Sequence, residues 1–344
     1  MEGDLVDFGL AAFGTVLGDP APVSTVVSAY TDDVERVLGY GYQTVHRSSP
    51  GVGVTDLAEL AAQRAMATAA IEPAELDLIV LGLTDIAEYL YWDAAASLQH
   101  RLGAGNAEAV LVTQACTTGM TGLDLIAGRF ATHPSYQTAL FVCANRTCEE
   151  YWNRMETQSM VFSDGAVAAI ARRGHPGLRW RASQVITDGR YADFYRLDQG
   201  GAARPFGTGP QPAEPPRAAD AWEILDFFHY EEEPFKRFIA QISERAQAVA
   251  QRACAQIGAD LSDLRRLILP HDNRHSFESL AAGFGLPLTA TNLELGLQTG
   301  HLGAADQLYS LSADAAAGRL ESGTLVALVG LGRGMHWACT LLEA

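Results

Sequence analysis

The stretch Ala109-Val-Leu-Val-Thr-Gln-Ala-Cys-Thr-Thr-Gly-Met-Thr-Gly-Leu-Asp-Leu-Ile-Ala-Gly-Arg-Phe130 decides the fold, because an apolar strand breaks near Cys116 and continues as a helix. A helix leaves its first N–H groups unpaired and has a positive dipole end, and both favour a thiolate at such a turn. We expect Thr117, Thr118 and Gly119 to supply these N–H groups. The stretch therefore predicts that Cys116 is a nucleophile for acyl transfer, with a buried structural cysteine as the alternative.

The composition is that of an ordinary globular protein with ample core. The chain has 344 residues, of which 48% are hydrophobic and 19% are charged, and its net charge is -17. This charge argues against nucleic acid and against an anionic membrane surface as the main partner. The five cysteines form no metal-ligand series, and the first residues show neither a basic region nor an apolar run. We therefore expect reduced thiols and a cytoplasmic location.

The first part of the chain alternates strands and helices. Apolar runs predict a strand within 5–17, a short strand at 78–81 that is covered on both faces, and further strands at 109–113, 139–144 and 163–171. Helical periodicity covers 57–69, a second helix is expected around 94–102, and a third continues from the turn at Cys116 to about Phe130.

The second part of the chain repeats this plan. It predicts helices at 242–257, from 277 and up to about 317, strands at 264–270, 324–329 and 335–342, and an element at 289–294 before a turn at 300–303. Ile79 precedes Cys116 by 37 residues, and Leu267 precedes His301 by 34. These intervals predict two similar halves, 1–174 and 175–344, whose packing brings Cys116 and His301 towards one cleft.

A stretch rich in proline and glycine lies between the halves and is followed by dense aromatic residues from Trp222 to Phe238. Such a stretch cannot form a regular helix or a central strand. We predict an insertion at about 199–238, which is either a plain surface insertion or a lid that shapes an acceptor pocket.

Five sequence segments, taken together, resemble the ketoacyl-carrier-protein synthase III branch of the thiolase superfamily. That family has a cysteine at a strand-to-helix turn, followed by segments of the form FGDGA, PHQAN, GN-T-S-A-A and FGGGFTWG. Here these are Cys116, Phe162-Ser-Asp-Gly-Ala166, Pro270-His-Asp-Asn273, Gly300-His-Leu-Gly-Ala-Ala305 and Leu331-Gly-Arg-Gly-Met-His-Trp337. Their order and approximate spacing hold over nearly the whole chain, which makes the combined signal strong where each motif alone would be weak.

The resemblance implies an α/β fold of the thiolase type, with five αβαβα layers and two pseudo-symmetric halves. It also implies a homodimer that binds acyl-CoA or acyl-carrier protein through the pantetheine arm, so that the acyl-CoA or acyl-phosphopantetheine is a donor substrate and no cofactor is bound permanently. Cys116 would then carry the acyl group.

The most informative departure from the family is His301, which replaces the third catalytic residue, an asparagine. Histidine can accept a proton near neutral pH, whereas asparagine can only form hydrogen bonds. We therefore predict an acyltransferase that moves the acyl group onto a hydroxyl, as in the ester-forming subgroup of antibiotic biosynthesis, with a natural product such as a glycoside as acceptor. The alternatives are a decarboxylating condensing enzyme that makes a polyketide or fatty-acid starter, and an acyl shuttle between carriers.

Two neighbouring residues compete for the remaining place in the site. His271 aligns with the catalytic histidine of the family, and Asp272 takes that place after a shift of one residue. We predict a triad of Cys116, His301 and Asp272, with His271 as the competitor for either role. Asp306 follows His301 closely, but an acid in the first turn of a helix is usually a partner of the helix dipole.

The C-terminal hairpin supplies the last candidates. The resemblance assigns an oxyanion or substrate-binding role to the loop of Gly332, Arg333 and Gly334, and Arg333, which replaces a glycine of the family, could pair with a carboxylate on the acyl group. His271 and His275 have the spacing of two metal ligands on a helix, but Pro270 and the lack of a third ligand argue against a metal site.

Overall fold

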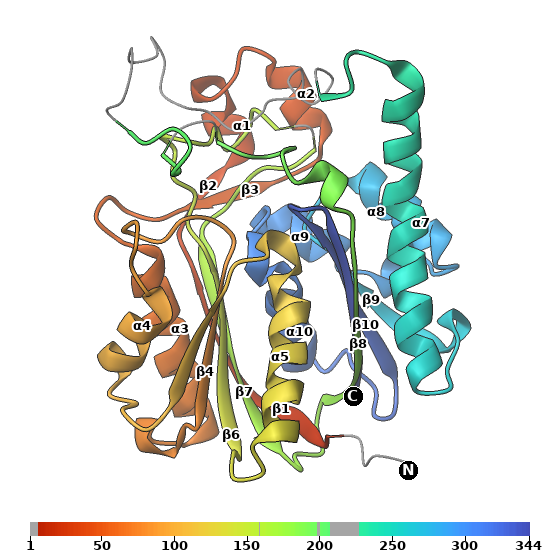
Figure 1. Ribbon diagram of the computed structural model, residues 1–344. Coiled ribbons are helices and arrows are strands. Elements are labelled where there is room, and N and C mark those ends of the chain that lie inside the picture. Colours follow the sequence, from red (N-terminus) through yellow and green to blue (C-terminus); the bar gives the residue numbers. More distant parts are fainter. Residues whose placement is uncertain (1–5, 158, 198–199, 207–226) are drawn as a thin grey trace.

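The computed structural model describes residues 6–157, 159–197, 200–206 and 227–344 (Figure 1). In this part of the chain, nine strands follow one another in a single hydrogen-bonded order, β5-β4-β6-β7-β1-β8-β11-β10-β9. Their bounds, in that order, are Glu108–Val112, Leu78–Leu83, Thr138–Asn145, Gly165–Arg173, Phe8–Leu17, Arg179–Thr187, His336–Glu343, Leu325–Gly332 and Leu264–Ile268.

The two halves of the sheet meet at β1 and β8, where Gly9 pairs with Arg179. In the first half β4 runs parallel to β5 and β6, and β7 is antiparallel to β6 and β1. In the second half β10 runs parallel to β9, and β11 is antiparallel to β10 and β8. Residues 174–178 connect β7 to β8.

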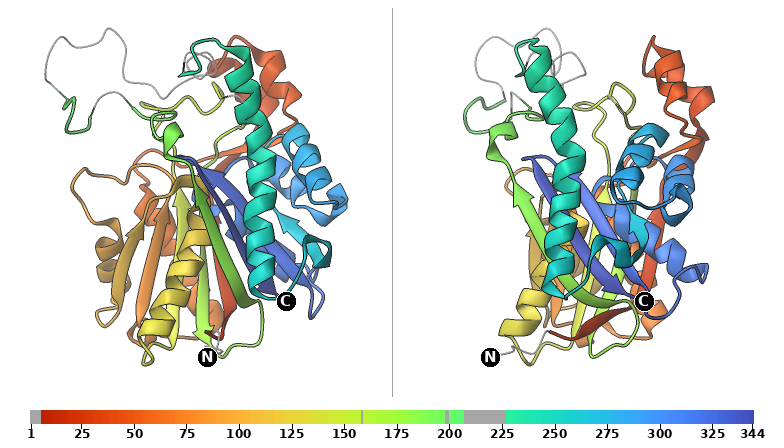
Figure 2. Two further views of the ribbon diagram at one scale, coloured as in Figure 1. Left: turned by 45° about the vertical axis from the view of Figure 1, so that its right-hand side comes forward. Right: turned by 90° about the vertical axis from the view of Figure 1, so that its right-hand side faces the viewer.

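Helices form the outer and central layers. Helix α3 (Val54–Ala69) packs on β1, β7 and β6, α7 (Glu232–Gln256) packs on β11, β8 and β10, and α5 (Thr118–Thr132) lies between the two halves of the sheet. Helix α10 (Asp306–Ala316) contacts β7, β9 and β10 from the same central layer. The views in Figures 1 and 2 show this succession of α3 with α4 (Ala94–Leu102), sheet, α5 with α10, sheet, and α7. The predicted thiolase-like α/β fold is confirmed.

Smaller elements cap the end of the molecule towards which β4 and β6 run. They are β2 (Asp19–Pro22) paired with β3 (Thr44–Arg47), and the helices α1 (Val23–Val26), α2 (Val34–Gly39), α8 (Arg274–Gly283) and α9 (Leu293–Thr299). The pairing of β2 with β3 and the whole of strand β8 were not predicted.

Strand β4 follows the prediction from its composition. All six residues of Leu78–Leu83 are buried, as expected for a parallel strand covered by helices on both faces.

The second half of the chain repeats the order of strands and helices less completely than expected. Residues 289–294 form no strand; a 3-10 turn at Leu288–Ala290 is followed by a single bridge between Leu267 and Thr291, and α9 begins at Leu293.

The expected insertion at about 199–238 lies partly outside the described residues, and Trp222 is among those not described. Helix α7 begins at Glu232, ten residues before the predicted start at Ile242, so the last part of the predicted insertion is helical. Phe228 and Phe238 are buried against Tyr191 and Phe194, with ring centroids 4.9–6.4 Å apart. These aromatic residues therefore extend the core under α7.

Candidate active site

Cys116 lies in a tight turn between β5 and α5. The turn is a 3-10 segment, Ala115–Thr117, and Ala115 before the cysteine has a φ of 49°, in the left-handed region that alanine rarely adopts. The Thr117 N–H donates to the Gln114 carbonyl at 3.2 Å, and the Thr118 N–H donates to the Ala115 carbonyl. The expectation that these two N–H groups are free was therefore wrong, because the 3-10 turn pairs them.

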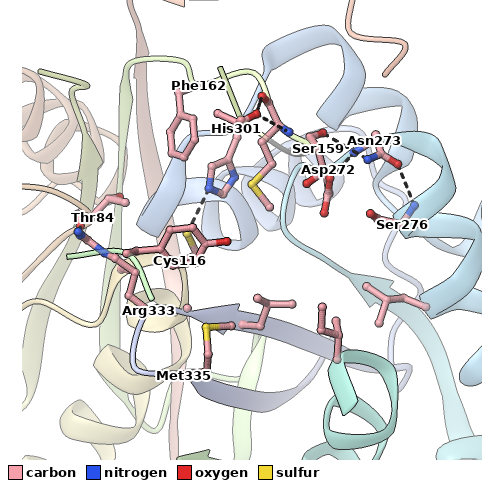
Figure 3. A pocket seen from close by; sticks show the side chains of 18 of the residues that line it. Thr84, Cys116, Ser159, Phe162, Asp272, Asn273, Ser276, His301, Arg333 and Met335 are labelled. Carbon is pink, nitrogen blue, oxygen red and sulfur yellow. Dashed lines mark hydrogen bonds between the residues drawn. The ribbon is translucent and has the colours of Figure 1, made fainter. Parts of the chain in front are cut away.

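His301 faces Cys116 across the central layer. Its Nε2 lies 3.1 Å from the Cys116 Sγ (Figure 3). The backbone of His301 is fixed on both sides, since its N–H donates to the Val161 carbonyl and its carbonyl accepts from the Ser163 N–H, each at 2.8 Å. The ring of Phe162 meets the imidazole edge-on, with centroids 4.9 Å apart. The contact expected between Cys116 and His301 is present.

The acid that contacts His301 is Asp306 and not Asp272. The Nδ1 of His301 donates to the Asp306 carboxylate at 2.5 Å, and both side chains are fully buried. The other oxygen of Asp306 accepts from the Leu302 N–H at 2.6 Å. The oxygen that contacts His301 also accepts from the His271 N–H at 2.8 Å. The expected contact of Asp272 with His301 is corrected because the turn from His301 into α10 brings the first helical residue back onto the ring.

The charges of the three groups reinforce one another. Burial by itself lowers the pKa of His301, but the charges of Asp306 and Cys116 and the hydrogen bonds to them outweigh it and hold the pKa well above its ordinary value. Burial raises the pKa of Asp306, yet His271 and His301 outweigh this effect and lower it. The Asp306 carboxylate beside His301 therefore favours the protonated form of the imidazole.

His271 does not enter the cavity. Its Nδ1 lies 2.8 Å from the Gly300 carbonyl, and because a carbonyl only accepts, Nδ1 carries a proton. Burial lowers the pKa of His271, and its Nε2 lies 2.8 Å from the Ser310 hydroxyl. With both ring nitrogens engaged and no exposure, His271 supports the Gly300 backbone and the Asp306 carboxylate.

Asp272, the next residue, lines the cavity without entering the triad. Its carboxylate accepts from the Asn273 N–H at 2.7 Å. Burial raises the pKa of Asp272, and the bonds from Asn273, Ser159 and Ser276 oppose this effect only in part. Adjacent residues His271 and Asp272 thus face different surroundings, as expected for an extended stretch.

The C-terminal hairpin approaches the nucleophile from the other side. A Cβ on Gly332 would lie 2.8 Å from the Gln114 carbonyl oxygen and 3.2 Å from the Thr117 nitrogen, so only glycine fits there. Arg333 donates through Nη2 to the carbonyl oxygen of Thr84. Gly332 and Arg333 line the cavity, and Gly334 follows them in the connection with a φ of 140°.

Five of these residues border one cavity of about 440 Å³, namely Cys116, Asp272, His301, Gly332 and Arg333. Its described lining combines apolar and aromatic side chains with many polar and charged ones, and Cys116 is partly exposed there. Several other lining residues were not predicted as site residues. They are three aromatic residues and four residues from α7 and α8: Trp152, Phe162, Tyr195, Ile239, Ile242, Ser276 and Leu280.

Metal-ligand clusters and membrane-spanning helices are both absent from the described residues. No group of three or more His, Cys, Asp and Glu side chains within the described ranges is placed to hold a metal ion. His271 and His275 do not form a ligand pair, because the His271 ring is engaged by Gly300 and Ser310. In the same part of the chain, no helix has the length and apolar character needed to cross a membrane.

Two family models match the chain, and both describe one family. The model of the 3-oxoacyl-[acyl-carrier-protein (ACP)] synthase III C terminal matches residues 254–344, and that of 3-oxoacyl-[acyl-carrier-protein (ACP)] synthase III matches residues 111–189. In these two regions the chain is similar to the ketoacyl-carrier-protein synthase III family. Enzymes of this synthase III type use acyl-CoA or acyl-carrier protein as substrates and need no permanently bound cofactor.

Relatives of the synthase III-like family match over most of their length. The β-ketoacyl-[acyl-carrier-protein] synthase III of Syntrophomonas wolfei is 29% identical over 84% of this chain and 82% of its own length. That of Synechocystis is 27% identical over 96% of both chains. Among solved structures, ChlB3, described as an acyltransferase, superposes with a TM-score of 0.85 at 23% identity and 98% coverage of both chains. The synthase III of Pseudomonas aeruginosa gives 0.77 at 21% identity, also with 98% coverage of both.

Proposed function

We propose that the chain is an ester-forming acyltransferase in which Cys116 carries the acyl group, His301 moves the proton and Asp306 orients His301. The observation that carries this proposal is the unbroken series of contacts from Cys116 Sγ to His301 Nε2 at 3.1 Å and from His301 Nδ1 to Asp306 at 2.5 Å. It has the order of nucleophile, base and orienting acid that activates a cysteine in acyl transfer.

In the loading step the Cys116 thiolate attacks the thioester carbonyl of an acyl-CoA or an acyl-phosphopantetheine. A bond forms between the cysteine sulfur and the carbonyl carbon, and the bond from that carbon to the donor sulfur breaks. The His301 imidazolium gives its proton to the departing thiolate. The products are acyl-Cys116, the free donor thiol and a neutral His301.

In the discharge step neutral His301 accepts the proton of an acceptor hydroxyl through Nε2. The oxygen attacks the acyl carbon, the bond from carbon to the Cys116 sulfur breaks, and the ester leaves. The thiolate and the imidazolium are restored. Acylation favours this order of events, because it removes the Cys116 charge that helps to hold the His301 pKa high.

The oxyanion of each step needs donors beside Cys116. The close approach of Gly332 to the turn of Cys116 supports a site formed by the Cys116 N–H and the loop of Gly332, Arg333 and Gly334. Arg333 is the only arginine or lysine among the described residues that line the cavity, and it would bind a carboxylate on a malonyl-type acyl group.

The position of His271 favours ester formation over condensation. Condensing members of the family use a histidine and an asparagine to stabilise the enolate of a malonyl thioester; here the asparagine position holds His301, and the His271 ring is engaged by Gly300 and Ser310 outside the cavity. The name of the ChlB3 acyltransferase and the resemblance to the cervimycin malonyltransferase agree with this choice. The acceptor would be a hydroxyl of a natural product such as a glycoside. The homodimer and the cytoplasmic location remain predictions.

The second candidate is a decarboxylating condensing enzyme, which the names of the synthase III relatives favour. An acyl shuttle between carriers would use the same loading step. Both differ from ester transfer in the fate of the acyl group on Cys116.

The test follows that fate in single turnovers. Enzyme loaded from a series of acyl-CoA donors is isolated, mixed with hydroxyl acceptors and followed by intact mass, with Cys116→Ala and His301→Asn as variants. We expect a thioester that depends on Cys116 and leaves as an ester, with discharge slowed about 100-fold or more in His301→Asn. Full activity of His301→Asn would remove the assignment of the base. Loading at the parent rate in Cys116→Ala would remove the nucleophile.

A further inference from the structure

Asp272 is a cavity carboxylate without a cationic partner. Of the three carboxylates among the described lining residues, Glu156 pairs with Arg36 at 3.0 Å, and the charge of Arg333 acts on Asp85. Within the described part of the chain, Asp272 makes no ion pair, and its hydrogen bonds come from the neutral groups of Asn273, Ser159 and Ser276. Asp272 is half-buried, and an opposite charge would stabilise a carboxylate in such a place.

Aromatic rings line the same cavity as this carboxylate. Tyr195 lines the same cavity, and its pKa is raised by burial and then by the charges of Cys116 and Asp272, so its ring lies within electrostatic range of both. The ring of Trp152, also in the lining, lies 6.5 Å from that of Tyr195 between centroids. A cavity lined by a carboxylate and by aromatic rings can bind an ammonium group, since both attract a cation.

The carboxylate is also well placed relative to the reacting groups. Figure 3 shows Asp272 and His301 on one side of the cavity, with Cys116 next to His301 and Arg333 on the opposite side. The His301 charge acts on Asp272 through space without an ion pair between them. A ligand held at Asp272 would therefore lie on the side of the cavity where His301 accepts the proton.

We propose that Asp272, with Trp152 and Tyr195, binds a cationic amine carried by the acceptor alcohol. The inference rests on the proposed ester transfer and names the class of its acceptor: amino alcohols and amino sugars that are protonated at neutral pH. The ammonium pairs with the carboxylate, and a hydroxyl of the same molecule is directed to His301 Nε2. The acyl group moves to that hydroxyl as described above, and the amine keeps its proton.

Direct binding is tested with two small alcohols of the same shape, choline and 3,3-dimethylbutan-1-ol, which differ in charge. Ligand-observed NMR titrations give their dissociation constants for the unmodified enzyme and for three variants. We expect choline to bind on the order of tenfold more tightly than the uncharged alcohol to the unmodified enzyme. Asp272→Asn should abolish the preference, and Trp152→Leu should reduce it while leaving the carboxylate in place.

Glu156→Gln is the matched control, because Glu156 lines the same cavity but is already paired with Arg36. It should keep the preference for choline. Equal affinity for the two alcohols, or a preference that survives Asp272→Asn, overturns the proposal. Since these titrations need no acyl group, their result is independent of whether Cys116 transfers one.

A second readout places the binding on the acceptor side. Acyl-Cys116 enzyme is mixed with each alcohol, and the ratio of the two discharge rates is measured within one enzyme preparation. We expect faster formation of the choline ester in the unmodified enzyme and a ratio near one in Asp272→Asn. A ratio unchanged by Asp272→Asn, together with slower loading from acyl-CoA, would assign Asp272 to the donor and overturn the proposal.

Discussion

His301 Nδ1 donates to Asp306 at 2.5 Å, and neither side chain is exposed to solvent. The first residue of α10 thus does more than stabilise the positive end of its helix, because it orients the imidazole that contacts Cys116. The opposite nitrogen is then the one available for proton transfer at the cavity.

The contact between His301 and Asp306 predicts that substitutions of Asp306 and Asp272 affect the discharge rate differently. Asp306→Asn should slow discharge of acyl-Cys116 by about 100-fold or more, because the ring loses its orienting charge. Asp272→Asn with an uncharged acceptor should change the same rate by less than about tenfold, since Asp272 does not contact His301 in an ion pair. Single-turnover rates of the two variants, each checked for its melting temperature, decide the assignment. A larger loss in Asp272→Asn would restore the triad expected from the sequence.

Stability should depend on pH through the same histidine. The folded-state pKa of His301 is raised above its ordinary value of 6.5, so its stabilising contribution is fully present below about pH 6.5 and is lost as the pH rises through the folded-state value. We expect the difference in unfolding free energy between the unmodified protein and His301→Asn to be largest near pH 6 and to shrink at alkaline pH. Denaturant titrations over this range measure it; a difference that grows with pH would contradict the assignment.

Helix α5 offers a matched pair of glycines for testing the packing of the central layer. A Cβ on Gly122 would clash with the ring of Phe141, whereas nothing lies within 4 Å of the Cβ position of Gly128. Gly122→Ala should therefore cost about 1–3 kcal/mol of unfolding free energy, and Gly128→Ala should add about 0.5–1 kcal/mol. Denaturation curves of the two variants give both values. Equal effects would mean that α5 is not held against β6 as described.

The loop of Gly332, Arg333 and Gly334 should not tolerate a larger side chain at Gly332. Because a Cβ on Gly332 would meet backbone atoms of Gln114 and Thr117 and the Thr117 hydroxyl oxygen, Gly332→Ala must push the loop away from Cys116. We expect loading and discharge to fall together by about tenfold or more, as donors of the oxyanion site move out of range. Rates of both half-reactions test this. Unchanged rates in a folded Gly332→Ala would exclude the loop from the oxyanion site.

The order of the main strands and helices could be predicted, because the buried strands are apolar and the two parts of the chain have similar spacing. Strand β4 is apolar throughout, and the similar spacing before Cys116 and His301 led to their contact. Strand β8 was missed because its residues from Arg179 to Thr187 mix polar and apolar side chains that are only partly covered. The start of α7 was missed because the acidic and aromatic residues around Glu232 have no clear periodicity.

The site itself could be predicted only up to the orienting acid. His271 and Asp272 occupy the position of a family motif, and nothing in the order of residues reveals which of the two faces the cavity. The sequence suggested that Asp306 stabilises the helix dipole. Its contact with His301 could not be predicted, because it depends on how the turn at Gly300 and Gly303 brings the chain back to the imidazole. The signal that could have identified it is an acid five residues after a histidine at the start of a helix.

The most direct test of ester transfer is the intact mass of the enzyme after incubation with malonyl-CoA, with Cys116→Ala as the control and evolved carbon dioxide measured in parallel. We expect a retained malonyl adduct that requires Cys116, without release of carbon dioxide, and its discharge onto a hydroxyl acceptor. An adduct formed only from acetyl-CoA, with carbon dioxide released from the malonyl donor, would contradict it and would mean that His301 leaves the condensing chemistry of the family in place.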